Sequence, residues 1–302
     1  MLHSRKYCKQ YERKLSKVNG FVNIIKPVGV SSSVIVSNVK RITKQKVGHL
    51  GTLDPLATGV LPVAIGKATR FFDYFLNKDK EYIAIGKFGV LTDTLDSEGC
   101  VIQTCNKKVE LEQVQSVLHQ FVGKIKQVPP IYSSKSVNGV KAYDLARKNK
   151  EIALEPRDVT IYSIEAKKWE QEDTFLFKIH CSAGTYVRAI VRDIANALGT
   201  IATTVCIIRT KSGCFNIDDA ITLQDFEQNY EDYVSSIFDV ISYPKLLINQ
   251  QQAIDLFSGK EIDFIGKNGN YLLSYNDDEF SVAELVGNKL RNKIYLYQGD
   301  LL

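Results

Sequence analysis

Apolar residues along the chain repeat at two spacings, one typical of β-strands and one typical of α-helices. Short apolar or β-branched runs bounded by turn-forming residues predict strands, which we expect at residues 21–25, 63–65, 81–88, 159–169, 175–181 and 203–208. Apolar positions three and four residues apart predict helices, which we expect at residues 31–43, 68–76, 112–121 and 185–198. The two kinds of element alternate irregularly, without the regular alternation of βαβ units. This pattern favours an α+β fold over a doubly wound parallel sheet.

Three segments depart from this alternation. Residues 47–62 are rich in Gly, Thr and Pro and cannot form one regular element. Residues 123–152 contain Pro129-Pro130, Asn138-Gly139 and seven Lys or Arg, so we expect a basic, partly mobile excursion instead of core. The tail, residues 245–302, has a helical spacing near 252–257 and strand-like runs at 271–275, 280–286 and 293–297. It predicts a small β-rich appendage.

The composition is that of a globular protein of about two domains. The 302 residues are 44% hydrophobic and 24% charged, and no apolar stretch approaches the ~20 residues of a membrane span. Six cysteines are scattered without a C-x-x-C pair, as expected for reduced thiols inside a cell. The four histidines include no H-E-x-x-H and no Cys/His cluster, so we expect no metal site.

Positive charge is concentrated at the start of the chain. Residues 1–18 hold six basic residues and one acidic residue, an excess equal to the net charge of +5 of the whole chain. A basic arm on a nearly neutral body fits a polyanionic partner. A solvated, disordered leader and an organellar transit peptide are the alternatives. We therefore divide the chain into a basic arm (1–18), a body (19–244) and a tail domain (245–302).

One loop carries the most specific chemical signal. Residues 48–59 read G-H-L-G-T-L-D-P-L-A-T-G, and their glycines let the backbone pass close to a bulky group. Asp54 precedes Pro55, which biases it away from helix. A carboxylate on such a loop is able to act as a nucleophile or a base. The alternative is that Asp54 caps a turn, as Asp-Pro often does.

This loop resembles the catalytic loop of the TruB-type tRNA pseudouridine synthases, whose signature is G-H-x-G-x-L-D-P-x-A-x-G. Further stretches resemble family motifs in the same order and extend the resemblance over about residues 20–245. They are N-I-I-K-P at 23–27 with Ser31-Ser32, T-D-T-L-D at 92–96 with Gly99, V-P-P at 128–130 with Tyr132-Ser133, C-S-A-G-T-Y-V-R at 181–188, and Arg209-Thr210.

The resemblance implies a role for seven residues. Asp54 matches the catalytic aspartate, Arg188 the arginine that pairs with it, and Tyr82 the tyrosine that stacks on the target base. The other four match positions that contact or support the substrate: His49 at the loop nucleotides, Tyr186 in the pocket, Ile207 in its wall and Lys26 supporting the site. Each also has an ordinary structural explanation, such as a strand aromatic for Tyr82 or a solvated helix charge for Arg188.

Two positions depart from the family pattern. Ile208 stands where relatives commonly have the first Arg of an Arg-Arg pair, and Cys214 replaces a frequent Pro. The first change removes a potential contact with RNA or a carboxylate, and the second lies in a turn where we expect no effect on catalysis.

The resemblance implies a pseudouridine synthase fold: a mixed, mostly antiparallel sheet with flanking helices, followed by a shortened PUA-like C-terminal domain. It implies isomerisation of the T-loop uridine at tRNA position 55, in the cytoplasm, without cofactor, metal, membrane or obligate protein partner. We expect segment 123–152 to be a flap that contacts the RNA. The alternatives are a guide-dependent relative of the dyskerin type, against which the length and the lack of long Lys-rich tails argue, and a non-catalytic RNA chaperone.

Overall fold

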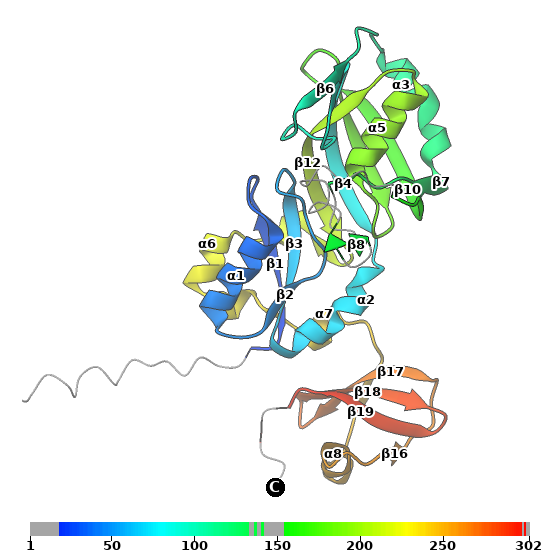
Figure 1. The fold of residues 1–302 in the computed structure, drawn as a ribbon. Coiled ribbons are helices and arrows are strands. Elements are labelled where there is room, and N and C mark those ends of the chain that lie inside the picture. Colours follow the sequence, from blue (N-terminus) through cyan, green and yellow to red (C-terminus); the bar gives the residue numbers. More distant parts are fainter. Residues whose placement is uncertain (1–17, 133–135, 138–139, 142–153, 298, 300–302) are drawn as a thin grey trace, which may run out of the picture.

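A single large sheet forms the framework of the body (Figure 1). The computed structural model describes residues 18–132, 136–137, 140–141, 154–297 and 299. In spatial order the strands of this sheet are β14 (Ser235–Ser236), β1 (Gly20–Lys26), β3 (Thr58–Ile65), β12 (Ala202–Ser212), β4 (Lys80–Phe88), β11 (Thr174–Cys181), β10 (Arg157–Lys168) and β7 (Gly123–Gln127), with β2 (Val47–His49) beside β3 and β13 (Phe215–Asn216) beside β12. Among the described strands of this sheet, only β3 and β12 pair in parallel. The expected mixed, mostly antiparallel sheet is confirmed.

Helices cover the two halves of this sheet separately. The helices α1 (Ser32–Thr43) and α6 (Leu223–Gln228) lie together beside β1 and β3, whereas α3 (Leu111–Val117) and α5 (Val187–Ala197) lie over the half that contains β4 and β10 (Figure 1). The helix α1 buries the apolar stripe of Ile35 and Val39. The shorter elements are η1 (Gly66–Phe71), α2 (Phe72–Leu76), β5 (Val90–Thr92), β6 (Val101–Thr104), η2 (Leu118–Phe121), β8 (Ser136–Val137), β9 (Val140–Lys141), η3 (Ile217–Asp219), η4 (Tyr230–Tyr233) and α7 (Ile237–Val240).

One expectation about the body is wrong. Residues Gly123–Gln127 are not part of a basic excursion, because they form the edge strand β7, paired with β10 in the register Gly123↔Ile161 to Gln127↔Arg157. Lys124 and Lys126 are exposed on its outer face while Gln127 is buried. The rest of the predicted flap lies mostly outside the described residues, as does the basic arm apart from Val18.

The tail forms a second sheet. Its strands in order are β15 (Lys245–Leu247), β17 (Gly269–Tyr275), β18 (Asp278–Val286), β19 (Lys289–Tyr295) and β16 (Ile262–Asp263), and α8 (Gln250–Phe257) packs beside them. The expected helix and three strands are confirmed. Leu272 and Val282 of this sheet pack in one apolar cluster with Phe21, Phe71 and Phe75 of the body. The tail is therefore joined to η1 and α2 by buried apolar surface. Among the described residues no helix is both long and apolar enough to cross a membrane.

Candidate active site

Asp54 lies on the loop that joins β2 to β3, and α1 holds this loop from one side. The hydroxyl of Ser32, in the first turn of α1, accepts a hydrogen bond from the Leu53 backbone N–H (2.9 Å) and donates one to the Leu53 carbonyl (3.0 Å). Ser32 is itself buried. One side chain thus satisfies both backbone groups of the residue before Asp54, which fixes the loop at that point.

Lys26, the last residue of β1, contacts the same loop through Pro55. Its side chain is fully buried at the end of β1, and Nζ donates to the carbonyls of Pro27 (2.7 Å), Val30 (2.7 Å) and Pro55 (3.2 Å). Burial lowers the pKa of Lys26 to about 8, while the charge of Asp54 acts in the opposite direction. Lys26 is therefore placed under Asp54-Pro55 and does not line the cavity described below.

Arg209 on β12 holds the loop from the other side, and the sequence analysis assigned it no role. The fully buried guanidinium donates to the carbonyls of Val60 (2.7 Å), Gly51 (3.0 Å) and Thr52 (3.3 Å). Gly59 allows the close approach of β3 to β12, because a Cβ there would lie 2.3 Å from the Arg209 carbonyl oxygen. The motif Arg209-Thr210 pointed to this position but not to its partners.

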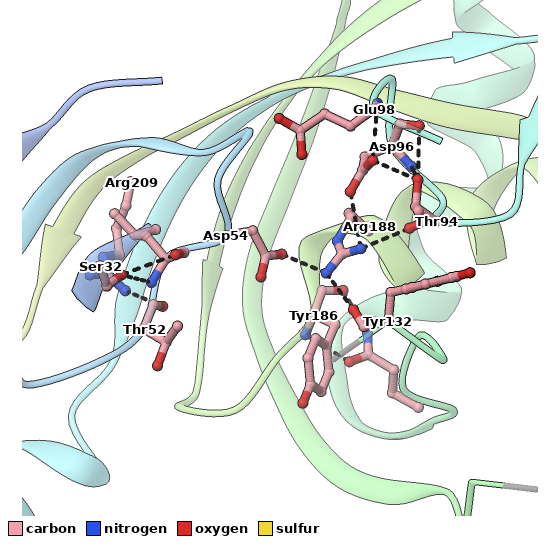
Figure 2. A network of polar contacts seen from close by, with 12 residues as sticks. Ser32, Thr52, Asp54, Thr94, Asp96, Glu98, Tyr132, Tyr186, Arg188 and Arg209 are labelled. Carbon is pink, nitrogen blue, oxygen red and sulfur yellow. Dashed lines mark hydrogen bonds and ion pairs between the residues drawn. The ribbon is translucent and has the colours of Figure 1, made fainter. Parts of the chain in front are cut away.

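Arg188 joins the loop to the opposite half of the body (Figure 2). It lies in the first turn of α5, where the helix dipole disfavours a cation. Two carboxylates compensate: Nη2 donates to Asp54 Oδ2 (2.6 Å) and Nη1 to Asp96 Oδ2 (3.1 Å). The carbonyls of Thr94 (2.7 Å) and Tyr132 (3.0 Å) accept the remaining bonds. Arg188 is buried and paired, so its interpretation as a solvated helix charge is wrong.

The two aspartates on Arg188 differ in exposure. Asp96 is buried, with 7% of its side chain exposed, and its Oδ1 accepts from the Thr94 hydroxyl (2.6 Å) and the Glu98 N–H (3.1 Å). The Asp54 side chain is 38% exposed, and within the described chain no hydrogen bond reaches its Oδ1. Asp96 therefore anchors the guanidinium, whereas Asp54 presents an oxygen to whatever enters the site.

A cavity of about 440 Å³ opens beside Asp54. Six of the seven residues singled out from the sequence line it, and Lys26 is the exception. The six are His49, Asp54, Tyr82, Tyr186, Arg188 and Ile207. The strands β2, β4 and β12 and the helix α5 each supply one of them, and the other two lie in the loop between β2 and β3 and directly before α5. The fold thus brings together positions spread over nearly 160 residues of sequence.

Tyr82 and His49 have pKa values that are shifted in favour of their neutral forms. Burial raises the pKa of the Tyr82 phenol above its ordinary value, although Arg209 opposes this. Burial, followed by the charge of Arg209, lowers the pKa of His49 below its ordinary value. The buried His49 Nδ1 has no hydrogen-bond partner among the described residues. The cavity thus offers a neutral phenol ring and a neutral imidazole next to an ion pair.

Several other side chains that line the cavity were not predicted as site residues. Phe72 and Leu76 of α2 lie at its wall and are 41% and 48% exposed. Lys80 and Arg157 also line it, and burial lowers the pKa of Lys80 to about 8. Single side chains of this kind carry no spacing signal in a sequence. Among the described residues no group of three or more His, Cys, Asp or Glu is placed to hold a metal ion.

Known proteins resemble the chain in sequence and in fold. The family model described as TruB family pseudouridylate synthase (N terminal domain) matches residues 40–187. The chain is 38% identical over 281 residues to tRNA pseudouridine synthase B of Caldanaerobacter subterraneus subsp. tengcongensis, which covers 91% of this chain and 98% of that protein. It is 45% identical over 215 residues to the protein of the same name from Trichormus variabilis, covering 70% and 73%. Among solved structures, a Cbf5-Nop10-Gar1 complex matches the fold with a TM-score of 0.67 at 24% identity, over 91% of this chain and 84% of that one.

Proposed function

Because the chain belongs to the TruB family of pseudouridylate synthases, we propose that it isomerises a uridine of tRNA to pseudouridine and that this uridine is the one at position 55 in the T-loop. The observation that carries the proposal is the Asp54–Arg188 ion pair at the wall of the cavity that Tyr82 and Ile207 also line. The names of the relatives in Caldanaerobacter and Trichormus support tRNA as the substrate.

The reaction requires one carboxylate and a closed space. The N1–C1′ bond of uridine breaks, the base turns, and C5 bonds to C1′, so no atom is gained and no electron is transferred. Asp54 is the candidate for the reacting carboxylate because it lines the cavity, its side chain is 38% exposed, and Arg188 binds only its Oδ2. Attack at C1′, addition at C6 and removal of the C2′ proton are all compatible with this arrangement.

The remaining side chains suit a base that has left its stack. A base-modifying enzyme has to extrude its target nucleotide, and stacking on an aromatic ring stabilises a single base by ~1–3 kcal/mol. Tyr82 supplies such a ring, and its raised pKa keeps it neutral. Ile207 is buried and lines the cavity, where an apolar side chain helps to retain the detached uracil. The cavity volume of about 440 Å³ is within the range of ~300–1,000 Å³ common for ligand sites.

Two other functions fit the fold less well. The solved Cbf5-Nop10-Gar1 complex matches the fold at only 24% identity, whereas the relatives at 38% and 45% identity are named for tRNA. These names favour a tRNA synthase over a guide-dependent relative. A non-catalytic chaperone would bind RNA by contacts spread over its surface and would not need a half-exposed carboxylate held by a buried arginine. We therefore favour the enzyme.

The test uses an unmodified tRNA transcript and a transcript with cytidine at position 55. We expect the purified protein to form pseudouridine in the first at position 55 and none in the second. The variant Asp54→Asn keeps the shape of the side chain but not its charge, so it should bind tRNA within about a few-fold of wild type and form no product. The exposed Asp218→Asn, a control with the same change, should behave as wild type. Product from Asp54→Asn would refute the role of Asp54, and modification at another position would refute the assigned site.

A further inference from the structure

The cavity is lined by four cations and a single carboxylate. The cations are Lys80, Arg157, Arg188 and Arg209, and the carboxylate is Asp54. Arg188 is paired with Asp54 and Asp96, and Arg209 donates to the carbonyls of two loop residues and of Val60 in β3. These two cations therefore hold the site together. The other two are left for what enters the cavity, and Arg157 is the better placed of them.

Arg157 has no salt bridge to any carboxylate in the part of the chain that the structure describes, and it is half-buried at the start of β10. Its guanidinium carbon lies 5.9 Å from the centre of the Tyr186 ring, at the outer limit of a cation–π contact. Lys80, by comparison, donates to the Lys78 carbonyl at 2.5 Å, and its pKa of about 8 leaves it only partly charged above neutrality. An arginine, unlike a lysine, is able to bind a phosphate through the two parallel N–H groups of its planar guanidinium.

Gly184 leaves room for the guanidinium of Arg157. This glycine has φ +79°, and a Cβ there would lie 1.9 Å from Arg157 Nη2 and 2.6 Å from its Cζ. The guanidinium thus occupies the space that any other residue at 184 would need. The same segment is tied to the sheet edge by Gln127, whose side chain accepts from the Tyr186 N–H (2.8 Å) and donates to the Tyr186 carbonyl (3.1 Å).

This placement suits a phosphodiester. Uracil and ribose carry no charge, so only the phosphates on either side of the flipped nucleotide would neutralise an unpaired guanidinium. The same phosphates would be repelled by Asp54 unless a cation lies near them. A guanidinium binds phosphate through two parallel hydrogen bonds, which also fixes its orientation.

We propose that Arg157 binds one of the two backbone phosphates that flank the flipped uridine, and that Gly184 and Tyr186 hold it ready to do so. The proposal rests on the proposed function, since it takes the ligand to be RNA with an extruded nucleotide. Arg157 is then a substrate-binding residue that places the ribose relative to Asp54.

The test measures binding of three T-arm stem-loop RNAs: one natural, one with an uncharged methylphosphonate on the 5′ side of the target uridine, and one with it on the 3′ side. Arg157→Gln should bind the natural RNA about 10- to 100-fold more weakly than wild type. The salt slope, which is the slope of the logarithm of the binding constant against the logarithm of the salt concentration, should be smaller in magnitude by about 0.7. KM should rise far more than kcat falls. One of the two methylphosphonate RNAs lacks the charge of the phosphate that Arg157 binds, and wild type and Arg157→Gln should bind this RNA equally. Arg157→Lys should retain the salt slope.

Lys167→Gln removes one charge from the exposed far end of the same strand and should bind all three RNAs like wild type. A loss for Arg157→Gln that is the same on all three RNAs would overturn the proposal, because it would show a structural role without a phosphate partner. The outcome is independent of the site of modification. Pseudouridine at another position would refute the assignment of uridine 55 as the target. The comparison of the three RNAs would still decide whether Arg157 binds a phosphate.

Discussion

At the residue scale, the site depends on buried cations that are solvated by backbone carbonyls. Lys26 and Arg209 both lie in the body without exposed surface, and their donors are distributed over carbonyls of the loop and of neighbouring turns. Burying a charge is costly unless it is hydrogen-bonded. The loop around Asp54 therefore stabilises these cations while they fix its conformation.

The lowered pKa of Lys26 predicts a pH dependence of stability. Between pH 8 and about 10.5 the unfolded chain keeps a proton on Lys26 that the folded chain has lost, so the free energy of unfolding rises with pH in this window and is flat below it. Relative to Lys26→Met, wild type should gain stability from pH 8 to pH 9.5, by at most about 1.4 kcal/mol per pH unit. Urea unfolding at pH 7.5, 8.5 and 9.5 measures this gain. Lys80 is present in both proteins, so its titration cancels, and exposed Lys87→Met is the control. Parallel profiles for wild type and Lys26→Met would contradict the prediction.

At the scale of the element, β12 organises the site. It pairs in parallel with β3, which follows the Asp54 loop, and antiparallel with β4, where Arg209 is in register with Tyr82. Ile207 and Arg209 are two residues apart on this strand and therefore point to the same face. One strand thus supplies the apolar wall of the cavity and the clamp on its loop.

Arg209→Lys tests this clamp because it keeps the charge and removes the planar fork. A lysine ammonium does not reproduce the geometry toward the carbonyls of Gly51, Thr52 and Val60, so we expect a loss of about 1–3 kcal/mol in the free energy of unfolding. Single-turnover isomerisation should slow by more than RNA binding weakens. Arg41→Lys, at an exposed ion pair with Glu227, should change neither. Wild-type stability and rate in Arg209→Lys would show that the loop is held by other contacts.

The elements of the body could largely be predicted because their signals are local. Short apolar runs at 81–88 and 175–181 predicted β4 and β11, and the motif over 48–59 pointed to Asp54. The strand β7 was assigned wrongly because Gly123–Gln127 is a short edge strand with one apolar side chain and two exposed lysines, and it comes shortly before Pro129-Pro130. The clamp by Arg209 was not predictable, since its acceptors are backbone carbonyls about 150 residues away in the sequence.

At the scale of the whole molecule, positive charge and chemistry are separated along the chain. The cavity is built by residues between 49 and 209, whereas the excess charge of the protein is in residues 1–18. A basic segment that contacts phosphates releases counterions from the RNA and steepens the salt dependence of binding. Binding and turnover are therefore expected to respond differently to loss of the arm.

Deleting residues 1–18 should weaken tRNA binding at low salt and flatten the log–log salt dependence by about one to three contacts, at ~0.7–0.9 per contact. The rate at saturating tRNA should be unchanged, because Asp54, Tyr82 and Arg188 are in the body. Binding isotherms at several salt concentrations measure the slope. An unchanged slope would favour a leader without a partner, and a lost rate at saturation would show that the arm packs on the body.

The parallel contact between β3 and β12 also affects the order in which the site forms during protein synthesis. Protein chains are made from the N-terminus and their parts fold as they emerge, yet here the loop bearing Asp54 is held by a guanidinium that is translated about 150 residues later. A nascent chain that ends before α5 already carries the aspartate and the tyrosine, but lacks both arginines that give them a fixed arrangement. We therefore expect reactivity toward RNA only after β12 has been synthesised and has taken its place between β3 and β4.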